Sequence, residues 1–358
     1  MLLCAASLSA QDSPKFEVWL QRPLVQNDLA YWHQKSPLGR SNISDIAQDS
    51  TGYIWMTSAE GVLRFDGHDV EVYDRSNVKV FNRDQFRQVV LSPDDILWVS
   101  TNENLYYYKD REFFVWKDES NQLKNNIERL EFDAEGNLWA LASGLLYRIE
   151  GNKSVKDPFE VGEVKSIIKC DQKLLWVVTE KEEVFTIDGT LSKTPLPFLN
   201  DLFPLGIQHV IGNKDKLIYV ALEGGELYMV KDGLKSKVNW SQQPDHDVRG
   251  NVIHSLKADS QGFVWVLAHE NLYRLNGVEV EIVNDSFGSS DFHVNTVFED
   301  RHGDYWIGTY SGVALLYQSA VGFIDYFNEG EVALTTSVYE DREGNVWVGS
   351  VNKGLFSV

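Results

Sequence analysis

Short apolar runs separated by turn residues alternate along most of this chain. Residues 42–74 show the pattern once, with strands predicted at 43–48, 52–57, 62–65 and 70–73. Glycine and aspartate stand at the junctions between these runs, as expected for tight turns. A four-stranded antiparallel sheet of this kind leaves both of its faces uncovered. The rest of the sequence must therefore supply something for the sheet to pack against.

The same unit recurs at a nearly constant spacing, marked by an aromatic residue in its second strand. The markers are Trp55, Trp98, Trp139, Trp176, Tyr219, Trp265, Trp306 and Trp347. They lie 43, 41, 37, 43, 46, 41 and 41 residues apart, which is the period of a four-stranded propeller blade. The residue nine positions before each marker is apolar in all eight repeats. The sequence thus predicts an all-β fold, a β-propeller of four-stranded antiparallel blades.

A turn motif precedes the marker in the better-formed repeats. Aspartate stands six positions before it, as in Asp49, and glycine three before it, as in Gly52. We expect a type I turn in which the carboxylate caps backbone N–H groups and the glycine adopts the left-handed conformation. Repeats two, four and five lack the glycine. Because the motif repeats, we assign these residues to the scaffold, with each marker aromatic buried between adjacent sheets.

With these residues in view, the repeats resemble the two-component-regulator propeller family. Its repeat reads approximately as an apolar strand, then Q-D-x-x-G-x-[IL]-W-[IV]-G-T, then G-[IL]-x-[RY]-[FY]-[DN]-G. This chain has IAQDSTGYIWMTSAEGVLRFDG at 46–67, VFEDRHGDYWIGTYSGVALL at 297–316 and VYEDREGNVWVGSVNKGLF at 338–356. The resemblance covers residues 42–358 and is specific for the propeller, much less so for the ligand that the propeller senses.

The resemblance implies the extracytoplasmic sensor half of a membrane receptor. Such receptors usually have two seven-bladed propellers, a small β-sandwich, a transmembrane helix and a cytoplasmic histidine kinase or diguanylate cyclase. We see none of the later parts in this sequence. The chain is therefore expected to be either a fragment of a receptor or a sensor that acts alone.

The number of blades depends on how the ring closes. A strand-like segment at 29–33 precedes the first repeat and could complete the last blade. If it completes repeat seven, residues 11–321 form a seven-bladed propeller and 322–358 hold an eighth repeat that begins a second propeller. If all eight repeats share one ring, residues 322–358 are the closing blade. The family favours seven blades.

The net charge and the N-terminal residues indicate which partners are excluded and in which compartment the protein acts. The 33 basic and 53 acidic side chains give a net charge of -20, which argues against nucleic acid or an anionic membrane surface as a partner. No apolar run is long enough to span a membrane. Residues 1–10, MLLCAASLSA, read as a signal-peptide remnant with small residues before a cut near Ala10. We therefore expect a periplasmic or extracellular protein.

Candidate binding residues lie where the predicted inner strands and their connecting loops meet the central channel. Long loops are expected at 75–85, 192–206, 235–250 and 285–291. The channel-mouth candidates are Asn42, Gln85, Arg87, Asn126, Arg129, His209, Glu223, His254, His269, His293 and Tyr310. Amides, cations and aromatic rings suit a carbohydrate or another small polar ligand. The competing interpretation is that propeller channels are wet and polar whatever their function.

Catalysis and metal binding find little support in the sequence. The channel-mouth histidines are spread over three repeats without metal-ligand spacing, so we expect no metal and no cofactor. The sequence contains no G-x-S-x-G, H-E-x-x-H or phosphate-binding glycine loop. A pair of carboxylates of the kind that glycosidases use could still lie in the channel.

The sequence leads to one preferred function and two alternatives. The preferred function is a ligand-sensing propeller region of a bacterial signal-transduction receptor, without catalysis of its own and self-associating in a receptor dimer. The alternatives are a secreted propeller enzyme, either a glycan lyase or a hydrolase, and a protein-interaction platform.

Overall fold

The computed structural model describes most of the chain between residues 29 and 357. The described residues are 29–31, 38, 41–123, 126–133, 135–156, 159–170, 174–187, 193–203, 206–213, 217–240, 252–268, 271–283, 293–316, 335–340, 346–350 and 354–357. Within these ranges almost all regular structure is β-strand, and the one helix is the short α1 (Pro197–Leu202). The all-β prediction is therefore confirmed.

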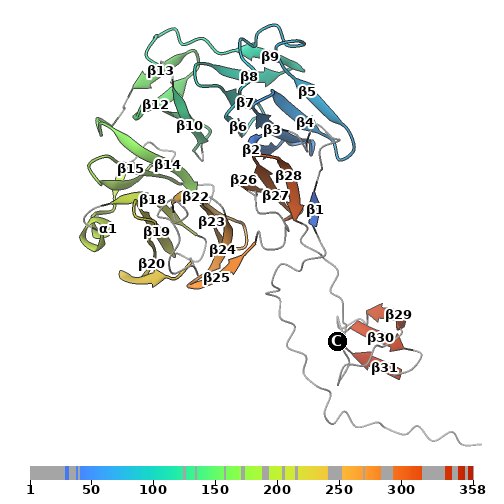
Figure 1. The fold of residues 1–358 in the computed structure, drawn as a ribbon. Coiled ribbons are helices and arrows are strands. Elements are labelled where there is room, and N and C mark those ends of the chain that lie inside the picture. Colours follow the sequence, from blue (N-terminus) through green and yellow to red (C-terminus); the bar gives the residue numbers. More distant parts are fainter. Residues whose placement is uncertain are drawn as a thin grey trace, which may run out of the picture. The chain divides into compact units, whose positions relative to one another are not determined.

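Seven four-stranded antiparallel sheets form the blades of a propeller (Figure 1). Blade one consists of β2 (Ile43–Gln48), β3 (Ile54–Ser58), β4 (Val62–Phe65) and β5 (Val70–Tyr73). Blade two consists of β6 (Gln88–Leu91), β7 (Leu97–Ser100), β8 (Leu105–Lys109) and β9 (Glu112–Val115). Blade three consists of β10 (Ile127–Phe132), β11 (Leu138–Ala142), β12 (Leu145–Glu150) and β13 (Lys153–Lys156). Blade four consists of β14 (Val164–Cys170), β15 (Leu174–Thr179), β16 (Val184–Ile187) and β17 (Lys193–Pro195).

The remaining three blades continue around the same axis. Blade five consists of β18 (Ile207–Gly212), β19 (Ile218–Leu222), β20 (Leu227–Lys231) and β21 (Leu234–Val238). Blade six consists of β22 (Ile253–Ala258), β23 (Val264–Ala268), β24 (Leu272–Asn276) and β25 (Glu279–Ile282). Blade seven consists of β26 (Val294–Glu299), β27 (Tyr305–Thr309), β28 (Gly312–Leu316) and β1 (Leu29–Tyr31). In each blade the first strand of the repeat lies innermost (Figure 1).

Strand β1 closes the ring. It pairs antiparallel with β28, with Leu29 opposite Leu316 and Tyr31 opposite Ala314. The N-terminal strand thus completes blade seven and covers its outer edge. The predicted preference for seven blades is confirmed, and the alternative ring of eight is wrong, because the closing strand does not pair with the eighth repeat.

The eighth repeat lies in a second compact unit and forms a three-stranded sheet of β29 (Thr335–Glu340), β30 (Val346–Ser350) and β31 (Gly354–Ser357). That it begins a second propeller stays a prediction. The predicted signal-peptide remnant at 1–10 and the boundary between residues 321 and 322 lie outside the described residues.

The strand predictions were accurate where apolar residues mark the strand. Three of the four strands predicted in blade one have the observed bounds, and the second, predicted at 52–57, runs from Ile54 to Ser58. Two predicted loops were wrong: residues 192–206 contain β17 and α1, and residues 235–250 contain most of β21. These outer strands lie at the rim, and the first four residues of β21 are exposed. A strand with little to bury carries little hydrophobic signal.

The turn motif adopts the predicted geometry and adds a hydrogen bond to the marker. Gly52 has a φ of 102°, and its N–H donates to the carbonyl of Asp49 at 3.1 Å, which closes the turn. One Asp49 carboxylate oxygen accepts from the indole N–H of Trp55 at 2.7 Å. The corresponding aspartate–indole distances are 3.0 Å for Trp139, 3.0 Å for Trp265 and 2.9 Å for Trp306.

Most marker aromatics are buried between adjacent blades, as predicted. Trp55, Trp139 and Trp265 are at most 2% exposed. Trp98 is the exception in the ring, because it is only partly buried. Blade two has Ser92 in place of the turn aspartate, and Trp98 packs against the cross-strand Tyr107, with ring centroids 5.4 Å apart.

Substituting Asp133 by alanine is expected to destabilise the protein by about 1–3 kcal/mol. The change leaves the fully buried indole N–H of Trp139 without its acceptor and removes the cap on the N–H groups of Glu135 and Asn137. The measurement is denaturant unfolding of the full chain. The matched control is Asp94→Ala, an exposed carboxylate, with an expected change under about 0.5 kcal/mol. Equal stability of D133A and D94A would contradict this role.

Deleting residues 1–31 is expected to lower the thermal unfolding midpoint and to promote aggregation, because the edge of β28 loses its partner. Differential scanning calorimetry and light scattering measure the two effects. A shorter truncation that ends before Leu29 is the control and should retain the wild-type midpoint. An unaltered midpoint in both truncations would show that β1 does not stabilise the ring.

Candidate functional site

Each inner strand presents two neighbouring residues to the central channel. A register shift, typical of a β-bulge, follows the first residue of the inner strand in six of the seven blades, for example between Ile43 and Asp45. The paired channel residues are Ser44 and Asp45, Arg87 and Gln88, Glu128 and Arg129, Lys165 and Ser166, Gln208 and His209, His254 and Ser255, and Asn295 and Thr296. All are polar, and all but Gln208 line at least one of two cavities.

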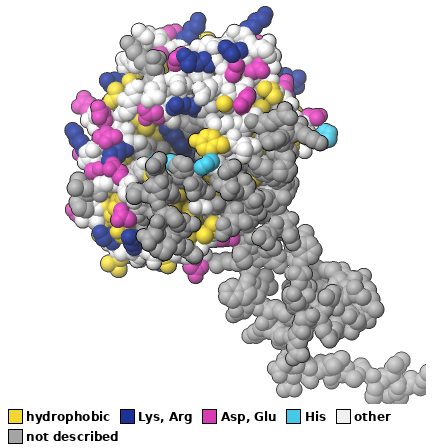
Figure 2. Space-filling view, in the orientation of Figure 1, with side chains coloured by type: hydrophobic (Ala, Val, Ile, Leu, Met, Phe, Trp, Pro, Cys, Tyr) yellow, Lys and Arg dark blue, Asp and Glu magenta, His cyan; other side chains and the backbone are white. Residues whose placement is uncertain are grey.

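The larger of these two cavities has a volume of about 490 Å³. Its walls come from blades one, two, three, six and seven: Asn42, Ser44, Asp45, Arg87, Gln88, Glu128, Arg129, His254, Ser255, Lys257, Asn295, Thr296 and Tyr310. Figure 2 shows a hollow on this face of the ring, with basic and histidine side chains at it. The cavity is therefore polar and opens to solvent.

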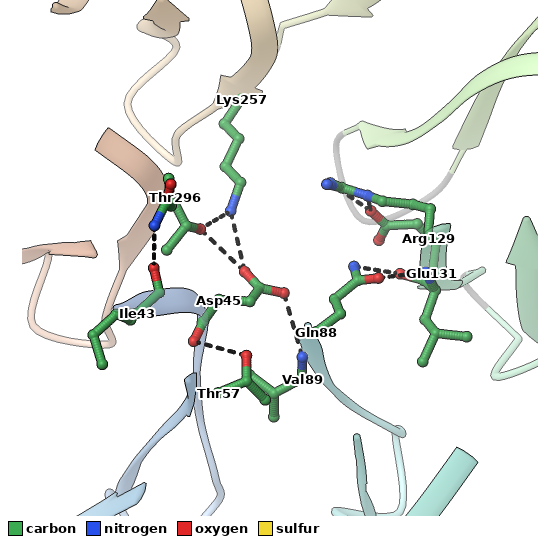
Figure 3. Close-up of polar contacts among 11 residues, drawn as sticks. Ile43, Asp45, Thr57, Gln88, Val89, Arg129, Glu131, Lys257 and Thr296 are labelled. Atoms are coloured by element: carbon green, nitrogen blue, oxygen red, sulfur yellow. Dashed lines mark hydrogen bonds and ion pairs between the residues drawn. The ribbon is translucent and has the colours of Figure 1, made fainter. Parts of the chain in front are cut away.

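Asp45 ties three blades together inside the channel (Figure 3). One carboxylate oxygen accepts from the Thr296 hydroxyl at 3.0 Å and lies 3.7 Å from the ammonium of Lys257. The Lys257 ammonium also donates to the Thr296 hydroxyl at 2.8 Å. Burial lowers the pKa of Lys257, and Arg129 lowers it further, while Asp45 and Glu131 oppose that shift.

Arg129 and Glu131 form an ion pair on blade three. The Nε and Nη2 atoms of Arg129 both lie 3.0 Å from the same oxygen of Glu131. Burial alone would lower the pKa of Arg129, but Glu131 and Asp45 more than offset it, so the pKa is raised. Next to this pair, the Gln88 side chain bonds the backbone of Leu130 through both its oxygen and its nitrogen, at 2.6 and 2.9 Å. Blades two and three are thus joined at the channel wall.

His209 lines a second cavity of about 180 Å³, which shares Glu128, Arg129, His254 and Ser255 with the first. Its Nδ1 atom lies 3.2 Å from the hydroxyl of Ser166. Burial, together with Arg129 and His254, lowers the pKa of His209 to about 4. The imidazole is therefore neutral at pH 7.

Six of the eleven predicted site residues line one or both of these cavities: Asn42, Arg87, Arg129, His209, His254 and Tyr310. Four lie elsewhere, and their surroundings explain why. Gln85 is exposed, and the Asn126 amide donates to Glu128 at 2.7 Å. Glu223 pairs with Lys165 at 2.7 Å, and the His293 ring contacts that of Tyr310 at 5.4 Å between centroids. The eleventh residue, His269, lies outside the described residues.

The sequence analysis missed several residues of the channel wall, including Asp45, Gln88, Lys257, Asn295 and Thr296. A signal for some of them was present. The residue ten positions before the marker is polar in all seven blades, as in Asp45, Gln88 and Thr296. Lys257 stands eight positions before its marker, where most other blades carry apolar residues, so no periodic signal identifies it.

Neither a metal centre nor a membrane helix is found in the part of the chain that the structure describes. No group of three or more His, Cys, Asp or Glu residues there is placed to hold a metal ion. No helix among the same residues is long and apolar enough to cross a membrane.

The free energy of unfolding is expected to fall by on the order of 1–3 kcal/mol between pH 6.5 and pH 4, because His209 takes up a proton less readily in the folded chain. Its pKa is lower in the folded chain than the value of 6.5 for an unperturbed histidine. The unfolded chain therefore takes up the proton first as the pH falls, and the stability present above pH 6.5 is lost by about pH 4. Unfolding at a series of pH values measures the loss.

The variant that tests this is His209→Gln, which should lose less stability over the same pH range. His68→Gln, at an exposed histidine, is the control and should follow the wild-type curve. If the H209Q curve runs parallel to that of the wild type, His209 is not the titrating group.

Solved structures share the fold of the chain. It matches two extracellular domains of B. thetaiotaomicron proteins, BT3049 and BT4673, both described as hybrid two component systems. The TM-score is 0.61 for each, with 15% and 20% identity, and the match covers 92% of this chain in each case but only 48% and 45% of those domains. This chain thus spans less than half the length of these relatives.

A propeller with a different role has a similar TM-score. Virginiamycin B lyase from Staphylococcus aureus matches with a TM-score of 0.58 and 13% identity, covering 77% of this chain and 95% of the lyase. At such identities the likeness shows the propeller fold alone. No curated protein matches the sequence.

The repeats themselves carry the family signal. Residues 288–311 and 332–352 match the family model described as two component regulator propeller. The two segments contain the markers Trp306 and Trp347, in the last blade of the ring and in the second unit. Two segments of this chain therefore resemble repeats of the two-component regulator propeller family.

Proposed function

We propose that this chain is the extracytoplasmic ligand-sensing region of a bacterial signal-transduction receptor, and that it binds a carbohydrate or another small polar molecule in the channel. The family repeats support the receptor context. The extracellular domains of two component systems with the same fold support a location outside the cytoplasm. The observation that carries the proposal is the 490 Å³ polar cavity built from five blades.

The cavity offers the groups that recognise a sugar. Tyr310 is 56% exposed at its wall and presents a ring on which a sugar face can stack. Asn295 donates to the Asn42 side chain at 2.8 Å and to the carbonyl of Ile43 at 2.8 Å, which fixes both amides at the opening. Fixed amides can bond hydroxyl groups at little entropic cost, because they are ordered before the ligand arrives.

The carboxylates of the channel favour binding over catalysis. Asp45 accepts from Thr296 and from the backbone N–H of Val89, Glu128 accepts from Asn126, and Glu131 accepts from Arg129. Each of these carboxylates thus accepts at least one hydrogen bond from the protein. A hydrolase would need one carboxyl group to donate a proton to the substrate and a second to act as base or nucleophile. We infer that the output of the receptor lies outside the propeller, and that bound ligand alters the packing of paired sensors.

The channel-mouth site is tested by ligand binding to the full chain. Thermal shift against a library of mono- and oligosaccharides identifies a ligand, and calorimetry then measures its affinity. Tyr310→Ala is expected to weaken binding by about tenfold, because a stacking contact contributes about 1–1.5 kcal/mol. Tyr339→Ala, at a tyrosine that is 66% exposed in the second unit, is the control and should bind as the wild type does.

Two outcomes would contradict the proposal. If no compound of the library binds, or if Tyr310→Ala binds as tightly as the wild type, the channel mouth is not the site. If incubation with polysaccharides releases new reducing ends or unsaturated products, the propeller is an enzyme and the proposal of a purely sensing region is wrong.

A further inference from the structure

The channel cavity has the opposite charge balance to the protein as a whole. The chain carries a net charge of -20, yet the cavity is lined by three basic side chains and two carboxylates. The basic side chains are Arg87, Arg129 and Lys257, and the carboxylates are Asp45 and Glu128. The lining thus holds one basic side chain more than it holds carboxylates, while Glu131, outside the lining, pairs with Arg129.

Arg87 is the basic group most available to a ligand. It belongs to the channel pair of blade two, its side chain is exposed, and it lines the cavity. Two exposed arginines nearby in the sequence pair with a carboxylate, Arg83 with Glu103 at 2.7 Å and Arg75 with Asp84 at 2.6 Å. Among the described residues, Arg87 has no such ion pair. Its guanidinium is therefore free to bind an anion.

Lys257 and Arg129 lie deeper and reach toward the same space from blades six and three (Figure 3). The carboxylate oxygen of Asp45 lies 3.7 Å from the Lys257 ammonium, beyond hydrogen-bond distance, and already accepts from Thr296. Arg129 directs two of its nitrogens at a single oxygen of Glu131. Neither cation has all of its donors used by these contacts, since an ammonium has three and a guanidinium five.

The two half-buried cations, Lys257 and Arg129, also affect each other. Both side chains line the same cavity, and the charge of Arg129 contributes to lowering the pKa of Lys257. The nearby carboxylates cannot shift to relieve this, because Asp45 and Glu131 are held by Thr296 and Arg129. An anion entering between them would be stabilised by both cations in a partly desolvated site, where charge interactions are stronger than in water.

We propose that the cavity selects sugars that carry a carboxylate, that is, uronic acids, with Arg87, Arg129 and Lys257 binding the carboxylate and Tyr310 stacking on the ring. The inference rests on the proposed sensing function and names its ligand class. The planar guanidinium forms paired hydrogen bonds that match a carboxylate. The amides of Asn42 and Asn295 then bond the sugar hydroxyls at the opening.

The test compares matched pairs of acidic and neutral sugars with the full chain. The probes are D-glucuronate against D-glucose, D-galacturonate against D-galactose, and trigalacturonate against galactotriose, measured by calorimetry. At least one acid is expected to bind tenfold or more tightly than its neutral counterpart. Its affinity should fall as NaCl is raised, because exposed charge interactions are screened.

Substitutions of the basic residues test which of them produce the preference for acidic sugars. Arg87→Gln and Lys257→Gln should each weaken binding of the acid by about tenfold and leave that of the neutral sugar unchanged, because only a charge contact is lost. Arg83→Gln, outside the cavity, is the control and should bind the acid normally. Lys257→Arg keeps the charge and should keep the selectivity. If Lys257→Gln does not fold, the exposed Arg87→Gln still decides the question.

The possible failures separate the two proposals. If the neutral sugars bind as tightly as the acids and Tyr310→Ala weakens both, the sensing function stands and the preference for acids is overturned. If the acids bind but Arg87→Gln and Lys257→Gln leave their affinity unaltered, the carboxylate site is overturned. If no sugar of either kind binds, the uronic acid inference falls, and the wider library then decides the sensing function.

Discussion

A propeller blade has two apolar faces, and it is stable only when a neighbouring blade covers each of them. Every blade has two such neighbours only when the last blade packs against the first. The structure meets this constraint where the two ends of the ring join. Phe65 of blade one packs edge-on against Trp306 of blade seven, with centroids 5.8 Å apart. Gly308 leaves room for Ile43, since a Cβ atom there would lie 2.7 Å from the isoleucine side chain. The pairing of β1 with β28 then covers the last open edge of that blade.

The hydrogen bond between turn aspartate and indole links the turn of a blade to its core. A buried indole N–H without an acceptor destabilises the folded state, and the aspartate supplies that acceptor from a turn it also caps. Blade four has lost this hydrogen bond. Its turn position is Cys170, and the Nε1 atom of Trp176 is buried without a hydrogen-bond partner among the described residues. We infer that the ring tolerates a weaker blade because its neighbours still cover both faces.

The fold was predictable because its determinants are local and repeat. The apolar residue nine positions before the marker recurs in eight repeats and the turn around Asp49 in five, so the copies reinforce one weak signal. Rim strands such as β21 escaped prediction because they bury almost nothing. The site was predictable only in part, since it depends on contacts between blades. Residues at the starts of the inner strands were identified, but Lys257 belongs to the site only because Asp45 of the first repeat and Thr296 of the seventh lie beside it.

The bulge in the inner strands places core residues and channel residues at separate positions of the same strand. One residue of each inner strand packs between blades and is constrained by the core, as Ile46 is, while the first residue of the channel pair is exposed in blades two, three and six, at Arg87, Glu128 and His254. Substitutions at these exposed positions change the channel without repacking the core, so they cost little stability. Mutation can therefore alter what the channel recognises one blade at a time while the architecture persists. Receptors built on this ring could diversify their ligands by point mutation alone, with no need for new loops.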